Sequence, residues 1–142
     1  MVMPQSPAMH EIVTAALVRA GRVLLVHRSP NRHAYPDVWD LPGGHIEPGE
    51  TELAALAREM HEELGVQIAT VSAIHLCRLG AGHGEESVRF SAWLVDEWKG
   101  TPANAAPDEH DEIRWFRPEE VPPLAHERMG PALVEAMRNT RA

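Results

Sequence analysis

The chain has 142 residues and a formal net charge of −8 at pH 7, with 44% hydrophobic and 24% charged residues. These values are typical of a single soluble globular domain over residues 1–142, and they exclude a basic surface for a nucleic acid polymer. The one cysteine, Cys77, excludes an intramolecular disulfide and a zinc site built from cysteines.

The N-terminal segment carries no targeting signal, and the single cysteine fits a reducing cytoplasm. Residues 1–9 combine proline with polar residues, and we expect them to form a flexible tail. They lack the basic start and apolar centre of a signal peptide, and no apolar run approaches the roughly 18 residues of a membrane span. We therefore expect a cytoplasmic location and no membrane partner.

Two apolar runs follow this tail. Residues 11–20 are apolar and β-branched, and residues 22–27 continue the pattern directly after Gly21. Such runs joined by a two-residue linker with glycine predict a β-hairpin. Residues 29–40 predict a loop, because turn-forming residues recur there: Pro30, Asn31, Pro36 and Asp37.

Five residues in and beside this loop lie next to a glycine pair, Gly43 and Gly44, and some of them are candidate substrate contacts: Arg28, Arg32, His33, Tyr35 and Trp39. Loops next to a site often carry specificity, and we select Arg28, Tyr35 and Trp39 from this set. The alternative is that Trp39 anchors the core and the others are ordinary surface residues. The sequence leaves both interpretations open.

Residues 44–66 predict a helix with a patch of carboxylates. One apolar stripe runs along it: Leu53, Leu56, Ala57, Met60 and Leu64. Glu59, Glu62 and Glu63 fall together beside the stripe, where their mutual repulsion opposes folding unless a cation offsets it. Carboxylate oxygens suit Mg²⁺ or Mn²⁺ better than zinc. The alternative is a solvated helix face.

Two further residues of this segment fit a metal site. Arg58 precedes Glu62 by four residues and can hold its carboxylate in one rotamer by a bidentate hydrogen bond. The backbone carbonyl of Gly44 can complete the metal's shell, since glycine lets the backbone approach a ligand closely. Gly65 suits the C-cap of the helix.

The rest of the chain alternates extended segments with turns. The elements expected in order are an extended segment at 66–79, a turn at Gly80, Gly82 and Gly84, its hairpin partner at 87–98, a loop at 100–107, a strand at 112–116, a helical turn from Pro118 and a helix at 131–138. This order favours an α+β fold in which helices cover a mixed sheet.

The segment 44–66 matches the Nudix box, Gly-x5-Glu-x7-Arg-Glu-U-x-Glu-Glu-x-Gly-U with U apolar, at every specified position: Gly44, Glu50, Arg58, Glu59, Met60, Glu62, Glu63, Gly65 and Val66. The chain therefore resembles the Nudix hydrolases. This resemblance implies an α/β/α sandwich with a curved mixed β-sheet and a catalytic loop-helix-loop. It also implies that Glu59, Glu62 and Glu63, with the Gly44 carbonyl, hold Mg²⁺, that Arg58 orients them, and that Glu50 is structural.

Many Nudix hydrolases carry a further catalytic or metal-binding carboxylate outside the box. Glu109 and Glu112 are the candidates, and a solvated acidic turn is the alternative. Asn104 has the donors and acceptor to read a base edge, although a loop asparagine is also a common turn residue. The nine histidines form no metal-binding pair, and we interpret them as surface or satisfied polar groups.

The resemblance implies an Mg²⁺-dependent hydrolase, with Mn²⁺ able to substitute, of a nucleoside diphosphate linked to a further group. We expect a MutT-like pyrophosphohydrolase that converts a (deoxy)nucleoside triphosphate to monophosphate and pyrophosphate, because the chain has no added N-terminal domain of the kind seen in many ADP-sugar enzymes. Hydrolysis of ADP-ribose, an ADP-sugar or a dinucleoside polyphosphate is the alternative, and a non-catalytic nucleotide sensor is an alternative of another class. The sequence does not decide whether the protein forms a homodimer.

Overall fold

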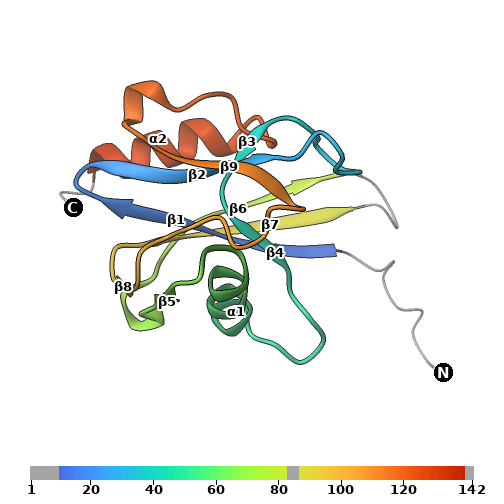
Figure 1. Cartoon of the computed structure of the whole chain (residues 1–142), viewed down its shortest axis with the longest axis horizontal. Helices are drawn as coiled ribbons and strands as arrows, with labels where there is room; N and C mark the ends of the chain where they lie inside the picture. Colours follow the sequence, from blue (N-terminus) through green and yellow to red (C-terminus); the bar gives the residue numbers. More distant parts are fainter. Residues whose placement is uncertain (1–9, 83–86, 140–142) are drawn as a thin grey trace.

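A mixed β-sheet forms the middle layer of the molecule, with one helix on each face (Figure 1). The computed structural model describes residues 10–82 and 87–139, so the expected tail at 1–9 and the turn residue Gly84 lie outside the described residues. Helix α1 (Glu52–Leu64) covers one face of the sheet and α2 (Met129–Asn139) the other. The expected α+β sandwich is confirmed.

The sheet has seven strands in one connected arrangement. Its main path runs β3 (Trp39–Asp40), β2 (Arg22–Arg28), β1 (His10–Arg19), β7 (Val88–Val95) and β6 (Ile74–Ala81). In addition β4 (Gly43–His45) pairs with β1, and β9 (His110–Phe116) pairs with β2. Strands β1 and β7 are parallel and the other pairs are antiparallel, so the sheet is mixed.

Strands β1 and β2 are apolar on both faces because each face meets a helix. Val13, Ala15 and Leu17 pack on the α1 side, while Ala16 and Val18 pack on the α2 side. The predicted stripe of α1 meets the first set, with Leu56, Met60 and Leu64 fully buried. Burying a side chain of this size contributes roughly 1.5–3 kcal/mol.

Local signals define both ends of α1. The Thr51 hydroxyl accepts a hydrogen bond from the Ala54 amide at 3.1 Å, which satisfies one free amide of the first turn. Gly65 adopts a left-handed conformation with φ of 71°, and its amide donates to the His61 carbonyl. The predicted C-cap is therefore confirmed.

Several predicted boundaries are corrected by pairing between distant segments. The extended segment at 66–79 is divided into β5 (Gln67–Ile68), a helical turn at Thr70–Ser72 and the start of β6. Gly80 belongs to β6 opposite Arg89, and the β5 partner is β8 (Trp98–Lys99). Strand β9 begins at His110 instead of residue 112 because it follows β2 to its end.

Candidate active site

Arg58 joins the helix to the loop that precedes it. Its guanidinium donates to both carboxylate oxygens of Glu50 at 2.8 Å and to the His45 carbonyl at 3.0 Å. Arg58 also donates to Glu59 at 2.9 Å and to Glu62 at 3.3 Å. The bidentate partner is thus Glu50, and not Glu62 as the helical spacing suggested, because the loop brings Glu50 alongside the helix. The Arg58 hydrogen bonds lower the pKa of Glu50 to about 2.

Gly44 lies directly against the carboxylate of Glu59. A Cβ atom at Gly44 would stand 2.5 Å from Glu59 Oε1, closer than real atoms approach. Strand β4 places Gly44 opposite Val13 of β1, so the backbone there has little freedom to move away. Only glycine therefore permits the backbone at residue 44 and the Glu59 carboxylate to occupy neighbouring positions.

Glu63 is buried one helical turn further on. It is only 2% exposed, its Oε1 lies 3.2 Å from His110 Nε2, and its Oε2 has no hydrogen-bond partner among the described residues. Burial raises the pKa of Glu63, and the neighbouring carboxylates of Glu59 and Glu109 raise it further. A buried carboxylate oxygen without a partner, close to other carboxylates, fits a divalent cation as its missing partner.

His110, the first residue of β9, supports Glu63 on α1. It is 2% exposed, and burial lowers the pKa of its imidazole to about 4, with nearby Arg32 and Arg28 lowering it further. The ring is therefore neutral at pH 7, and in the tautomer with hydrogen on Nε2 it donates to Glu63 Oε1. Such a bond orients a carboxylate for a cation.

Glu62 lies apart from Glu59 and Glu63. Its carboxylate is 55% exposed and is paired with Arg58. Residues four apart share a helix face more closely than residues one or three apart, so Glu59 and Glu63 face the sheet while Glu62 faces outward. In the described ranges no three carboxylate, imidazole or thiol side chains are gathered closely enough to form a ready metal site.

A cavity of about 570 Å³ opens over Gly44 and Glu59. Its lining includes the carboxylates of Glu47, Glu59 and Glu109, which we call the acidic side. It also includes four residues of the apolar cluster on the α2 face of the sheet, which we call the apolar side: Ile12, Leu41, Val88 and Phe90. A larger hollow of about 710 Å³ lies beside α2, lined by the segment 121–125 and by α2 residues, and contains none of the glutamates of the box. Of the box glutamates, Glu59 lines the 570 Å³ cavity, and we interpret this cavity as the substrate site.

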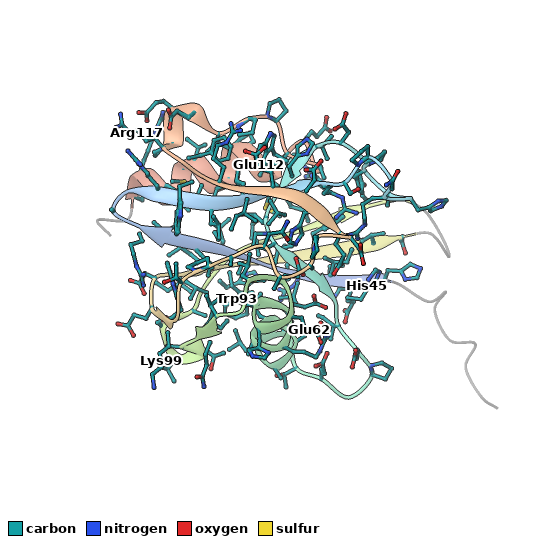
Figure 2. The ribbon with its side chains drawn as sticks, viewed as in Figure 1. His45, Glu62, Trp93, Lys99, Glu112 and Arg117 are labelled. Atoms are coloured by element: carbon teal, nitrogen blue, oxygen red, sulfur yellow. The ribbon has the colours of Figure 1, made fainter. Side chains whose placement is uncertain are left out.

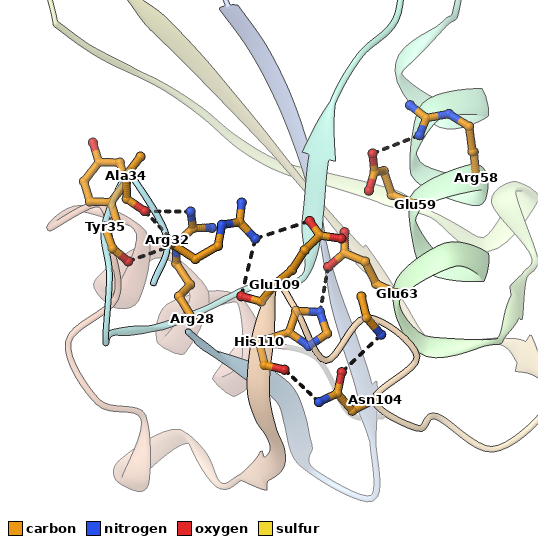
Figure 3. A network of polar contacts seen from close by, with 11 residues as sticks. Arg28, Arg32, Ala34, Tyr35, Arg58, Glu59, Glu63, Asn104, Glu109 and His110 are labelled. Carbon is orange, nitrogen blue, oxygen red and sulfur yellow. Dashed lines mark hydrogen bonds and ion pairs between the residues drawn. The ribbon is translucent and has the colours of Figure 1, made fainter. Parts of the chain in front are cut away.

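Arg28 and Tyr35 both line this cavity. The guanidinium of Arg28 donates to the Ala34 carbonyl at 2.7 Å and to the Tyr35 carbonyl at 3.0 Å (Figure 3). Tyr35 has a φ of 49°, a conformation that a bulky residue adopts only when its surroundings hold it. Arg28 therefore fixes the loop that places Tyr35 at the cavity.

Trp39 and Asn104 do not line the cavity. The Trp39 ring packs on Phe116 with centroids 5.0 Å apart, on the α2 side of the sheet, as expected for a core anchor. Asn104 Nδ2 donates to the His110 carbonyl at 2.7 Å, and its Oδ1 accepts from the Ala106 amide at 3.2 Å. Asn104 thus supports the loop that carries Glu109, and both ends of its amide are already engaged.

Glu109 and Glu112 have opposite placements. Glu109 lines the cavity, whereas Glu112 is paired with Arg114 on β9. Figure 2 shows Glu112 in the layer of α2 and Glu62 in the layer of α1. The cause is a register shift in the β2 and β9 pairing, where Arg28 faces His110 while His27 faces Glu112. The extra residue, Asp111, reverses the alternation and turns His110 toward α1.

Sequence reasoning missed His110 and Asp40. Asp40 lines the cavity, and burial raises its pKa to about 6, opposed by the Leu41 amide and by Arg28. Its position directly before residues 41–44 was an available signal. His110 had no such signal, because it contacts Glu63 from β9 to α1, and the two residues are 47 positions apart in the chain.

The chain belongs to the Nudix family, since the family model described as NUDIX domain matches residues 9–136. It is a Nudix hydrolase, with the box residues placed on α1 and the preceding loop. Nudix hydrolases generally use divalent metal ions. No helix in the described part of the chain is long and apolar enough to cross a membrane.

Three similar proteins match this chain over most of their length. The CTP pyrophosphohydrolase of Escherichia coli K12 is 35% identical over 117 residues, which cover 80% of this chain and 79% of that protein. The nucleoside triphosphatase NudI of Salmonella arizonae is 31% identical, covering 77% and 82%. The crystal structure of a MutT Nudix hydrolase from Burkholderia pseudomallei is 31% identical with a TM-score of 0.78, covering 89% and 96%.

Proposed function

We propose that this protein hydrolyses a nucleoside triphosphate to the monophosphate and pyrophosphate, with Mg²⁺ as its cofactor and Mn²⁺ able to replace it. The observation that carries the proposal is the cavity, whose lining combines the carboxylates of Glu59 and Glu109 with the apolar side chains of Ile12, Leu41 and Phe90. A molecule with a charged chain at one end and a flat apolar ring at the other matches this division. The triphosphate substrates in the names of two relatives support the same class.

The apolar side suits the base and sugar. Phe90 and Leu41 offer surfaces for a base, and Tyr35 stands 6.5 Å from Phe90 between ring centroids. Asp40 and Arg28 line the same cavity and offer hydrogen-bond acceptors and donors, respectively. We assign to them the hydrogen bonds that orient the nucleoside.

The acidic side suits the phosphate chain together with a cation. Glu59, Glu63 and the Gly44 carbonyl would hold the cation, and Glu62 would join them on leaving Arg58. When bound, Mg²⁺ offsets the phosphate charge and lowers the pKa of an attacking water. Arg58 keeps Glu59 in place, His110 keeps Glu63 in place, and Glu59 or Glu109 accepts the proton of the attacking water.

A substrate panel tests the proposal. Ribonucleoside and deoxynucleoside triphosphates, ADP-ribose and a dinucleoside polyphosphate are each incubated with Mg²⁺, and the products are separated by chromatography. We expect monophosphate and pyrophosphate from at least one triphosphate. In ¹⁸O-labelled water the label should enter pyrophosphate, because water attacks the second phosphorus from the nucleoside.

Two results would contradict the proposal. If ADP-ribose is cleaved and the triphosphates are not, the proposed metal site stands and the proposed substrate is wrong. Tight nucleotide binding without turnover would instead indicate a nucleotide sensor.

A further inference from the structure

Arg32 and Glu109 form an ion pair at the acidic side of the cavity. Arg32 Nη1 lies 3.2 Å from Glu109 Oε1 and 3.4 Å from the Glu109 carbonyl, so one nitrogen is shared by two acceptors (Figure 3). The Arg32 side chain is 29% exposed and that of Glu109 is 48% exposed. A long, shared and partly exposed contact of this kind is weak.

Arg32 has donors left for a ligand, unlike the neighbouring Arg28. Arg28 uses its Nε and Nη2 atoms on the carbonyls of Ala34 and Tyr35. The Nε and Nη2 atoms of Arg32 make no hydrogen bond within the described residues, and Arg32 lines the same cavity as Gly44 and Glu59. Of the two arginines that line this cavity, Arg32 therefore has the larger part of its guanidinium available for a phosphate.

Glu109 lies close to the buried carboxylate of Glu63. Figure 3 shows the Glu109 carboxylate pointing toward Glu63, between that residue and Arg32. The charge of Glu109 is close enough to raise the pKa of Glu63. Glu109 therefore stands between two positive partners, namely the Arg32 guanidinium and a cation held by Glu59 and Glu63.

We propose that Arg32 exchanges partners when substrate binds: it pairs with Glu109 in the ligand-free protein and with a phosphate of the nucleotide afterwards, which frees Glu109 for the cation. This inference rests on the proposed function. A phosphate carries more charge than the Glu109 carboxylate and offers several oxygens to the arginine fork, so the exchange is favourable. Nucleotide binding and cation binding are thereby coupled through one side chain.

A double-mutant cycle on Mn²⁺ affinity tests the exchange. The whole chain is titrated with Mn²⁺ by electron paramagnetic resonance, as wild type, Arg32→Gln, Glu109→Gln and the double variant. Without nucleotide, we expect Arg32→Gln to bind Mn²⁺ about tenfold more tightly than wild type, because Glu109 is free in that variant. The double variant should differ from Glu109→Gln by less than about twofold in Mn²⁺ affinity, because no Glu109 carboxylate is left to be freed.

A second titration adds a triphosphate whose bridging oxygen between the first two phosphorus atoms is replaced by a methylene group. The Mn²⁺ affinities of wild type and Arg32→Gln should then become similar, because Glu109 is free in both. The analogue itself should bind Arg32→Gln about tenfold more weakly. Arg89→Gln is the matched control, since Arg89 pairs with Glu11 at 3.3 Å and does not line the cavity.

The outcomes separate this inference from the proposed function. If Arg32→Gln tightens Mn²⁺ binding equally with and without Glu109, Arg32 acts only as a nearby positive charge and the exchange is refuted. If wild type binds neither Mn²⁺ nor the analogue, the proposed function fails first. Thermal unfolding checks that every variant folds, and Arg32→Lys, which keeps the charge and loses the fork, replaces Arg32→Gln if that variant does not.

Discussion

Glu62 and Glu63 are adjacent in the chain but differ in burial and in their polar partners. Glu63 is 2% exposed with one unpartnered oxygen, whereas the Glu62 side chain is 55% exposed and paired with Arg58. A buried carboxylate near other carboxylates is costly unless a cation compensates it. Burial of the Glu63 carboxylate therefore lowers the free energy of unfolding, whereas a solvated glutamate has no such effect.

Glu63→Gln should lower kcat by more than about a hundredfold with the fold intact, because it removes a charged ligand while keeping its shape. Steady-state kinetics measure the loss, and circular dichroism checks the fold. Glu119→Gln is the matched control, since Glu119 is exposed on the helical turn at Pro118–Glu120. Equal effects of the two substitutions would mean that Glu63 is not a metal ligand.

His110 acts through Glu63 and should affect cation affinity before it affects chemistry. Removing the Nε2 bond with His110→Phe should weaken Mn²⁺ binding by about 10–100-fold, the usual effect of losing a hydrogen bond to a metal ligand. His110→Gln, which keeps a donor, should recover part of that affinity. Unchanged Mn²⁺ affinity in the phenylalanine variant would show that His110 only fills space.

Asp40 makes stability depend on pH. Its pKa is about 6 in the folded protein, mainly through burial, and 3.8 in the unfolded chain. The folded state therefore binds the proton more tightly, so the stabilisation by protonated Asp40 is complete below pH 3.8 and is lost as pH rises through 6. The loss is at most about 3 kcal/mol.

Asp40→Asn should remove this dependence. Urea unfolding from pH 4 to pH 8 should show the variant gaining stability over wild type as the pH rises, because asparagine carries no charge to bury. Its Oδ1 can still accept from the Leu41 amide, which lies 2.9 Å from Asp40 Oδ1. A constant difference between the two proteins over this range would contradict the assignment.

At the scale of elements, the first turn of α1 is tied to the sheet by Glu52. Its carboxylate accepts from the Ser91 hydroxyl at 2.5 Å, from Trp93 Nε1 at 3.0 Å and from Arg78 Nη2 at 2.7 Å. These donors come from β6 and β7, so the tie fixes the start of the helix on the strands. Sequence alone presents Glu52 as one more solvated helix residue.

Glu52→Gln should therefore destabilise the fold by about 1–3 kcal/mol, because the charge-assisted bonds to β6 and β7 weaken or break. Denaturant unfolding measures the change, with Glu119→Gln again as the reference for an exposed glutamate. We also expect a lower kcat, since the same helix positions Glu59 and Glu63. Wild-type stability in Glu52→Gln would show that packing of Leu56 and Met60 alone positions α1.

At the scale of the whole molecule, a net charge of −8 is combined with a cavity that carries several of the carboxylates. A cation that binds only the folded state should stabilise it by mass action. Saturating Mg²⁺ at about a hundred times its dissociation constant should raise the unfolding free energy by about 2.7 kcal/mol. Chelation with EDTA should abolish turnover, and full activity in EDTA would end the metal hypothesis.

The sequence by itself determined the features that depend on short spacings. The box, the apolar stripe of α1, the Gly65 cap and the β1–β2 hairpin all arise from residues within a few turns of one another. Helical periodicity determines which residues share a face of the helix, so that arrangement can be inferred from the sequence without the tertiary structure. Two short-range assignments were wrong. The bidentate partner of Arg58 is Glu50, in the loop before the helix, and Glu62 faces outward instead of grouping with Glu59 and Glu63.

The tertiary structure alone decided which distant residues join the box. The contacts of Glu63 with His110 and of Arg32 with Glu109 cross from α1 or the first loop to the segment around β9. The register shift at Asp111 places His110 and Glu112 on opposite faces of β9, and Glu109 lines the cavity whereas Glu112 does not. Such a shift depends on how β9 packs against β2, and neither strand's own sequence specifies that packing.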